Sequence, residues 1–210
     1  MGIQPDTRRS GRRRSEEKRE RILDAAAAVF LEDGFAASMD RVARLADVSK
    51  QTLYSHFESK EGLYRAMAER LRWKMQDRID PAKPVLDNLE MFGRAFRAKV
   101  MAPETVAMHR QLVGQATQFP ELAALHDEHG PLRSLRLLGA AIEAAMDRGE
   151  IRRDDPLIAA EQFIALCQGL VRHRLMFGTA ATPTEAENET AVARAVDVFM
   201  RAYRPEPERA

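Results

Sequence analysis

The chain is poor in cysteine and in long apolar runs, and each shortage excludes a class of protein. Cys167 is the single cysteine among 210 residues, so an internal disulfide is impossible and a reducing cytoplasm is the expected location. No apolar run approaches the roughly 18 residues that a membrane span needs. The first residues carry no recognisable export or myristoylation signal. We therefore expect a cytoplasmic protein without a membrane partner.

The signatures of common enzymes are also missing. The sequence has no glycine-rich phosphate loop, no GxSxG elbow and no spaced metal triad. The stretch "HDEH" places His126 and His129 on one helical face, where they could bind a metal, but a polar helix end is the preferred interpretation. We therefore expect no enzyme, no cofactor and no metal.

Charge is present in both signs but is unevenly distributed. The net charge is +1, yet residues 1–75 hold 16 Lys and Arg against 12 Asp and Glu. The extreme is "RRSGRRR", which contains Arg8, Arg9, Arg12, Arg13 and Arg14 and no acid. Such a block is either a solvated tail or a basic arm that binds phosphates or enters a DNA minor groove. The tail does not decide between these readings by itself.

Helical periodicity runs along nearly the whole chain, which predicts an all-α fold. No useful stretch alternates with a period of two residues, and the two prolines of "DPAKP", residues 80–84, mark the best domain boundary. The predicted organisation is a flexible basic arm at 1–15, a small helical domain at 16–58, a connecting helix at 59–80 and a larger helical domain at 81–210.

The stretch "DVSKQTLYSHFESKEGLY", residues 47–64, has the parts of a helix-turn-helix. Ala43 is small enough for two helices to approach closely, and residues 46–48 supply the turn. Leu53 and Phe57 share one face of the second short helix, which predicts that this face is buried. The other faces, with Lys50, Gln51, Tyr54 and Ser55, are then free to contact a partner.

The exposed residue types suit a DNA duplex. Gln51 can pair with adenine and Lys50 can reach guanine in the major groove. Ser38 and Ser49 are good N-caps, which place helix N-termini near backbone phosphates. The side chains of Tyr54, His56 and Lys60 are of the right length to hold neighbouring phosphates.

The stretch "FAASMDRVARLADVSKQTLYSHFESKEGLYRAM", residues 35–67, closely resembles the DNA-binding domain of TetR/AcrR-family transcriptional regulators. The resemblance is strong over residues 16–67. It extends more weakly to "FPELAALHDEHG" and "DRGEIRRDDPLIAAEQF", which look like the AefR-type regulatory domain. The turn position often filled by glycine is Asp47 here, and Asp tolerates a left-handed backbone better than most residues.

The resemblance implies a homodimeric repressor that binds a palindromic operator in double-stranded DNA. It implies that Lys50 and Gln51 lie nearest the bases, and that Tyr54 contacts backbone and a thymine methyl. The other backbone contacts it implies are Ser38, Ser49, Thr52, His56 and Lys60. It also implies that residues 16–58 are the helix-turn-helix DNA-binding domain and that residues 81–210 are a C-terminal ligand-binding, regulatory and dimerisation domain. The homodimer would form through the last two long helices, roughly residues 156–177 and 185–203.

Apolar stripes of the C-terminal part are the candidates for a ligand pocket. Most such residues are core, and the sequence does not separate a filled core from a hollow one. A small lipophilic effector would contact Phe92, Phe96, Met108, His109, Leu112, Phe119, Phe163, Cys167 and His173. Gln111 and Gln115 are further polar candidates. A DNA-binding or nucleoid-associated factor that answers to a protein partner, or to no ligand, is the open alternative.

Overall fold

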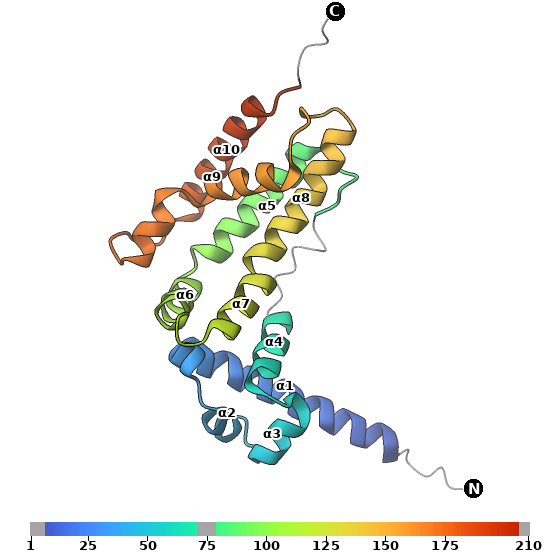
Figure 1. Cartoon of the computed structure of the whole chain (residues 1–210), viewed down its shortest axis with the longest axis vertical. Coiled ribbons are helices and arrows are strands. Elements are labelled where there is room, and N and C mark those ends of the chain that lie inside the picture. The colour runs from blue at the N-terminus through green and yellow to red at the C-terminus, as the bar shows by residue number, and fades with distance from the viewer. Residues whose placement is uncertain (1–6, 71–78, 206–210) are drawn as a thin grey trace, which may run out of the picture. The chain divides into compact units, whose positions relative to one another are not determined.

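The computed structural model describes residues 7–70 and 79–205, and these ranges contain helices and no strand (Figure 1). The prediction of an all-α fold is confirmed. The elements are α1 (Thr7–Asp33), the 3-10 turn η1 (Gly34–Ala36), α2 (Met39–Leu45), α3 (Lys50–Phe57), α4 (Lys60–Arg70), α5 (Val85–Val100), α6 (Pro103–Gln115), α7 (Pro120–His129), α8 (Pro131–Asp147), α9 (Pro156–Met176) and α10 (Glu185–Ala202). None of these helices is both long and apolar enough to cross a membrane.

The chain divides into two compact units, and each unit is built from two separate stretches of the sequence. Unit 1 consists of Met1–Arg72 and Arg110–His126, and unit 2 consists of Trp73–His109 and Asp127–Ala210. The domain boundaries predicted from the sequence assign residues 110–126 to the C-terminal domain. In the structure, this segment belongs instead to unit 1, together with the helix-turn-helix. The predicted break at 80–84 lies inside unit 2, where residues 81–83 form a turn before α5.

The core of unit 1 is built from one face of α1 and the short helices that follow it. Ile22, Ala26 and Phe30 recur at helical spacing and are fully buried. Leu53 and Phe57 of α3 are buried in the same unit, as their spacing predicts. Burial of α3's inner face fixes which of its side chains point outward.

The N-terminal helix starts earlier than the sequence suggests. A flexible arm is predicted for residues 1–15, whereas α1 begins at Thr7. Arginine is a good helix former, and Arg13 donates a hydrogen bond to Glu17 at 3.1 Å, one turn along the helix. Residues 7–15 are thus the first part of α1 in this structure, and residues 1–6 lie outside the described ranges. The flexibility of the arm stays a prediction. The predicted connecting helix at 59–80 is described only as α4, because residues 71–78 also lie outside.

Unit 2 has a single large apolar core formed by α5, α8, α9 and α10. Phe92 stacks on Phe96 with ring centroids 5.4 Å apart. Phe163 meets the ring of Phe199 edge to face at 5.5 Å. Leu89 and Ile142 are fully buried in the same cluster. Burial of apolar area on this scale is the main force that holds the four helices together.

The helix α9 is broken at Gly169. This residue has φ 53° and ψ −173°, a backbone conformation that residues with a side chain rarely adopt. The carbonyl of Cys167 lies two residues before this break. The buried guanidinium of Arg97 binds there, since its Nη1 donates to the carbonyl oxygen of Cys167.

Candidate nucleic-acid interface

The turn between α2 and α3 has the geometry of a helix-turn-helix. Asp47 has φ 51°, so the predicted left-handed conformation at this position is confirmed. The N–H of Asp47 donates to the carbonyl of Arg44 at 3.2 Å, and that of Val48 donates to Ala43 at 3.0 Å. These two bonds close the end of α2 and direct the chain into α3.

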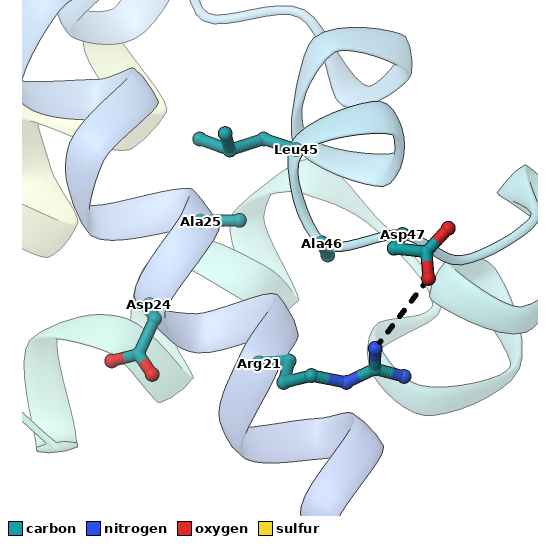
Figure 2. A pocket seen from close by; sticks show the side chains of 6 residues that line it. All are labelled: Arg21, Asp24, Ala25, Leu45, Ala46 and Asp47. Carbon is teal, nitrogen blue, oxygen red and sulfur yellow. Dashed lines mark ion pairs between the residues drawn. The ribbon is translucent and has the colours of Figure 1, made fainter.

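A shallow groove of about 340 Å³ borders this turn on unit 1. Three apolar and three charged residues line it, and Figure 2 labels all six: Arg21, Asp24, Ala25, Leu45, Ala46 and Asp47. The guanidinium of Arg21 lies 3.8 Å from the carboxylate of Asp47 (Figure 2). This ion pair ties α1 to the turn, so the groove is best explained as part of the support of α3.

The start of α3 is capped as the sequence predicts. The side chain of Ser49 accepts a hydrogen bond from the N–H of Thr52 at 3.1 Å, and the two hydroxyl oxygens lie 2.8 Å apart. Ser38, at the N-cap of α2, makes no such side-chain bond. Ser38 is exposed, and its hydroxyl makes no capping hydrogen bond to the backbone of α2.

The outward side of α3 carries the residues predicted to read bases. Lys50, Gln51 and Tyr54 are exposed, while Leu53 and Phe57 on the opposite side are buried. We call Lys50, Gln51 and Tyr54 the recognition face. The structure brings these three side chains to one surface, with Ser55 beside them and His56 half-buried.

Lys50 has an acidic partner that the sequence pattern does not indicate. Its Nζ lies 2.8 Å from the carboxylate of Asp40 on α2. The hydrogen bond and the charge of Lys50 lower the pKa of Asp40, and Asp40 in turn raises the pKa of Lys50. Both side chains are exposed, so a DNA base or phosphate can compete for the amine. The spacing of ten residues gave no signal, because it joins two different helices.

Lys60 differs from the other predicted phosphate contacts because it points inward. Its Nζ donates to the carbonyl oxygen of Phe35 and lies 5.0 Å from the ring centroid of Phe119. Burial lowers the pKa of this amine. An amine that also held a phosphate would have to give up these contacts, so the geometry favours an internal role.

The arginine block is described only in part. Arg13 and Arg14 are exposed on the first half of α1, and Arg13 pairs with Glu17. The side chains of Arg8, Arg9 and Arg12 lie outside the described residues, although their backbone belongs to α1. Contact of this block with DNA stays a prediction.

Two glutamines of α6 hold the end of α1, and we call them the glutamine clasp. Gln115 donates to the carbonyl of Asp33 at 3.0 Å and accepts from the N–H of Ala36 at 2.9 Å. Gln111 donates to the carbonyl of Glu32 at 3.1 Å. A helix end leaves carbonyls without partners, and the clasp satisfies two of them. Both residues therefore support the helix-turn-helix, whereas the sequence analysis had considered them as pocket residues.

The segment that contains the clasp also contributes aromatic and histidine contacts within unit 1. Phe35 lies edge to face with Phe119 at 6.5 Å and with Tyr64 at 5.5 Å between ring centroids. The hydroxyl of Tyr64 lies 3.1 Å from Nδ1 of His126. In the same "HDEH" stretch, Glu128 pairs with Arg136 at 2.6 Å. Among the described residues, no three His, Cys, Asp or Glu side chains are grouped so as to hold a metal ion.

The residues predicted to line a ligand pocket do not all come together. Phe92, Phe96, Phe163 and Cys167 share the core of unit 2, with Met108 and His109 half-buried on α6. Burial raises the pKa of Cys167 to about 12, which keeps the thiol protonated. Leu112 and Phe119 belong instead to unit 1. His173 is exposed and its ring lies 4.6 Å from that of Phe177.

Family models match both the N-terminal and the C-terminal part of the chain. The family model "Bacterial regulatory proteins, tetR family" matches residues 22–67, and "AefR-like transcriptional repressor, C-terminal domain" matches residues 87–205. The solved structure of "Flavonoid-responsive Regulator FrrA" is 31% identical, with a TM-score of 0.76 over 90% of this chain and 98% of that one.

Two curated relatives add to this comparison. The uncharacterized HTH-type transcriptional regulator YhgD of Bacillus subtilis is 29% identical over 158 residues, which are 74% of this chain and 83% of YhgD. The HTH-type transcriptional activator FasR of Mycolicibacterium smegmatis is 47% identical over 64 residues, which are 30% of this chain and 29% of FasR.

Proposed function

Because the chain belongs to the TetR family of DNA-binding transcriptional regulators, which are not enzymes, we propose that it is a homodimeric repressor released from a palindromic operator by a small lipophilic ligand. The observation that carries this proposal is the recognition face, whose three side chains are exposed on a helix that is capped at its start and anchored by buried residues. Such a regulator acts on DNA in the cytoplasm.

In the proposed complex, α3 lies in the major groove. Gln51 pairs with adenine, and Lys50 exchanges Asp40 for a guanine edge. Tyr54 contacts backbone and a thymine methyl. The phosphate contacts that we retain come from Ser38, Ser49, Thr52 and His56 and from the arginines of the block at 8–14. We leave Lys60 out of this set because its amine already holds the Phe35 carbonyl and the Phe119 ring.

The exposed apolar side chains of α9 and α10 support a homodimer. Leu170 and Phe177 are 72% and 71% exposed. Further exposed apolar residues of these two helices are Leu157, Ile158, Leu166 and Val198. Exposed apolar side chains that gather on two helices are typical of an interface. A two-fold dimer presents two recognition helices about 34–36 Å apart to successive major grooves, which is why we propose a palindromic operator.

Release follows from linkage between ligand and DNA. A ligand that binds better to a conformation with the wrong spacing weakens operator binding by the same difference in free energy. FrrA is named as responsive to flavonoids, which supports an aromatic or otherwise lipophilic effector for this chain as well. FasR is named as an activator, and its similarity spans 64 residues, 30% of this chain, so activation is the second candidate.

The test is an operator titration with purified full-length protein, with and without compounds that raise its melting temperature. A compound present at 100 times its dissociation constant should stabilise the protein by about 2.7 kcal/mol. The proposal requires that such compounds weaken operator affinity, by about 100-fold for a differential affinity of that size. A series of tight-binding compounds that leave operator affinity unchanged would favour a regulator that does not answer to a ligand.

A further inference from the structure

Arg97 of α5 is a cation enclosed in unit 2 without an acidic partner among the described residues. Only 3% of the residue is exposed. Its Nε donates to Oδ1 of Asn188 at 2.9 Å, and its Nη1 donates to the carbonyl oxygen of Cys167. Both acceptors are neutral, so the hydrogen bonds are satisfied while the charge is not compensated.

Two further polar groups of unit 2 are buried and unsatisfied. Within the described part of the chain, Nη1 of Arg172 and the hydroxyl oxygen of Thr105 have no hydrogen-bond partner although solvent does not reach them. Burial also lowers the pKa of Arg172. Buried polar atoms without partners are rare in native proteins, and each one calls for an explanation such as an absent ion or ligand.

Each of the three groups lies close in sequence to a residue of one small apolar cluster. It consists of Met101, Val106 and Leu175, with Val171 and Met176 packed against it. Thr105 directly precedes Val106 on α6, and Arg172 lies one helical turn before Leu175. Arg97 lies one turn before Met101 on α5. Residues three or four apart on a helix are neighbours, with Cβ atoms about 5–6 Å apart, so Arg172 lies beside Leu175 and Arg97 beside Met101, and Thr105 is next to Val106 in the chain.

The chemistry that satisfies this arrangement is a carboxylate on an apolar body. A guanidinium binds a carboxylate through two parallel hydrogen bonds, and a hydroxyl can add a third. The apolar cluster provides the contact for the rest of the ligand. Resting on the proposed function, we infer that the effector of unit 2 is an apolar carboxylic acid whose carboxylate binds Arg172 and Thr105, with Arg97 contributing charge behind them.

A second copy of the chain does not account for Arg172. Its Nη1 is already buried within one chain, so a partner packed on the outside of α9 cannot reach that nitrogen. Support of the break at Gly169 accounts for the hydrogen bonds of Arg97 to Cys167, but it gives Arg172 and Thr105 no partner.

The first test needs no ligand. The buried Nη1 of Arg172 has lost water without gaining a hydrogen bond, which destabilises the ligand-free protein, so Arg172→Met should raise the melting temperature of the full-length chain by about 2–4 °C. Arg153→Met is the control, because Arg153 is 74% exposed and pairs with Asp147 at the surface. Its melting temperature should change by less than about 1 °C. A lower melting temperature for Arg172→Met would show that Arg172 has an internal partner and would overturn the inference.

The second test uses octanoate, dodecanoate and 2-naphthoate, each paired with its neutral primary amide, in calorimetric titrations of the full-length protein. At least one acid should bind about 10- to 100-fold more tightly than its amide, because a charged hydrogen bond is lost in the amide. Arg172→Met should abolish this preference, whereas Arg97→Lys, which keeps the charge, should retain it. No preference for any acid, or a preference that survives Arg172→Met, would overturn the inference.

Operator titration separates the two proposals. If the amides bind and release the operator as well as the acids do, the carboxylate inference fails and the proposed function stands. If an acid binds through Arg172 and leaves operator affinity unchanged, the carboxylate site stands and ligand-controlled repression fails.

Discussion

The recognition face of unit 1 and the interior of unit 2 are held in place by different forces. Lys50, Gln51 and Tyr54 are exposed polar side chains, and what fixes them is a capped helix, a left-handed turn and the glutamine clasp. The interior of unit 2 is fixed by apolar packing among α5, α8, α9 and α10. The first region depends on directional hydrogen bonds, and the second depends on buried area.

Because different forces hold the two regions, substitutions in them should differ in their effects on stability and on DNA affinity. Loss of buried area is costly, so unit 2 should show the largest effects on stability. Loss of a single hydrogen bond or cap costs less, but in unit 1 it also moves the surface that we propose contacts DNA. Stability and DNA affinity should therefore respond differently in the two regions.

The largest expected effect is that of Phe163→Ala. Phe163 is fully buried and contacts the rings of Phe92 and Phe199 at centroid distances of 6.3 and 5.5 Å. Truncation leaves a cavity, which should lower the free energy of unfolding by about 3–5 kcal/mol. Thermal unfolding followed by circular dichroism measures this. Operator affinity without ligand, measured well below the new melting temperature, should be unchanged, and a parallel loss of affinity would contradict the contrast between the two regions.

Two glycines of unit 1 should respond to alanine with opposite signs. Gly34 has φ +59°, and an added Cβ would lie 2.7 Å from Oε1 of Gln115. Gly34→Ala should therefore cost about 1–2 kcal/mol or more, since it combines backbone strain with displacement of the clasp. Gly114 lies on α6 with open space around a built Cβ. Gly114→Ala should stabilise the protein by about 0.5–1 kcal/mol. Equal effects in chemical denaturation would show that the turn at Gly34 is not constrained.

The glutamine clasp should have a moderate effect on stability. Gln115→Ala removes one hydrogen bond to Asp33 and one from Ala36, which should cost about 1–2 kcal/mol. Gln118→Ala, at an exposed position near the end of the same segment, is the control. Operator affinity should fall for Gln115→Ala alone, because the end of α1 and η1 directly precede α2. If the two variants behave alike in both measurements, the clasp does not support the interface.

The smallest effects on stability distinguish a structural cap from a DNA contact. Thr184 and Glu187 form a reciprocal capping box at the start of α10, so Thr184→Ala should cost about 0.5–2 kcal/mol. Ser38 makes no side-chain cap bond, and Ser38→Ala should leave thermal stability almost unchanged. The same change should weaken operator binding if Ser38 contacts a phosphate. A stability loss at Ser38 equal to that at Thr184 would instead show that it is a structural cap.

The sequence predicts the helix-turn-helix well because its determinants are local. The turn at Asp47, the cap at Ser49 and the buried pair Leu53 and Phe57 depend on residues only a few positions apart, and all are confirmed. Gln115 and Lys60 could not be assigned in this way, because their partners lie 82 and 25 positions away along the chain. Both were interpreted by residue type alone.

Unit 2 was predictable as a set of helices but not in its interior. The periodicity indicates α9, yet it gives no sign that Gly169 breaks the helix beyond the presence of a glycine in a helical pattern. The partner of Arg97, the carbonyl of Cys167, is 70 positions away along the chain. An arginine in a helical sequence is normally read as exposed, so Arg97 and Arg172 gave no signal.

If the recognition face reads bases, replacing Gln51 should change the selectivity of the protein for single base pairs. An operator found by selection from random DNA is changed at each base pair in turn, and binding titrations compare the wild-type protein with Gln51→Ala. We expect Gln51→Ala to lose selectivity at one base pair in each half-site, by about 1–3 kcal/mol, and to keep it elsewhere. Full selectivity at every base pair in the Gln51→Ala variant would contradict the assignment of α3 as the element that reads DNA through this side chain.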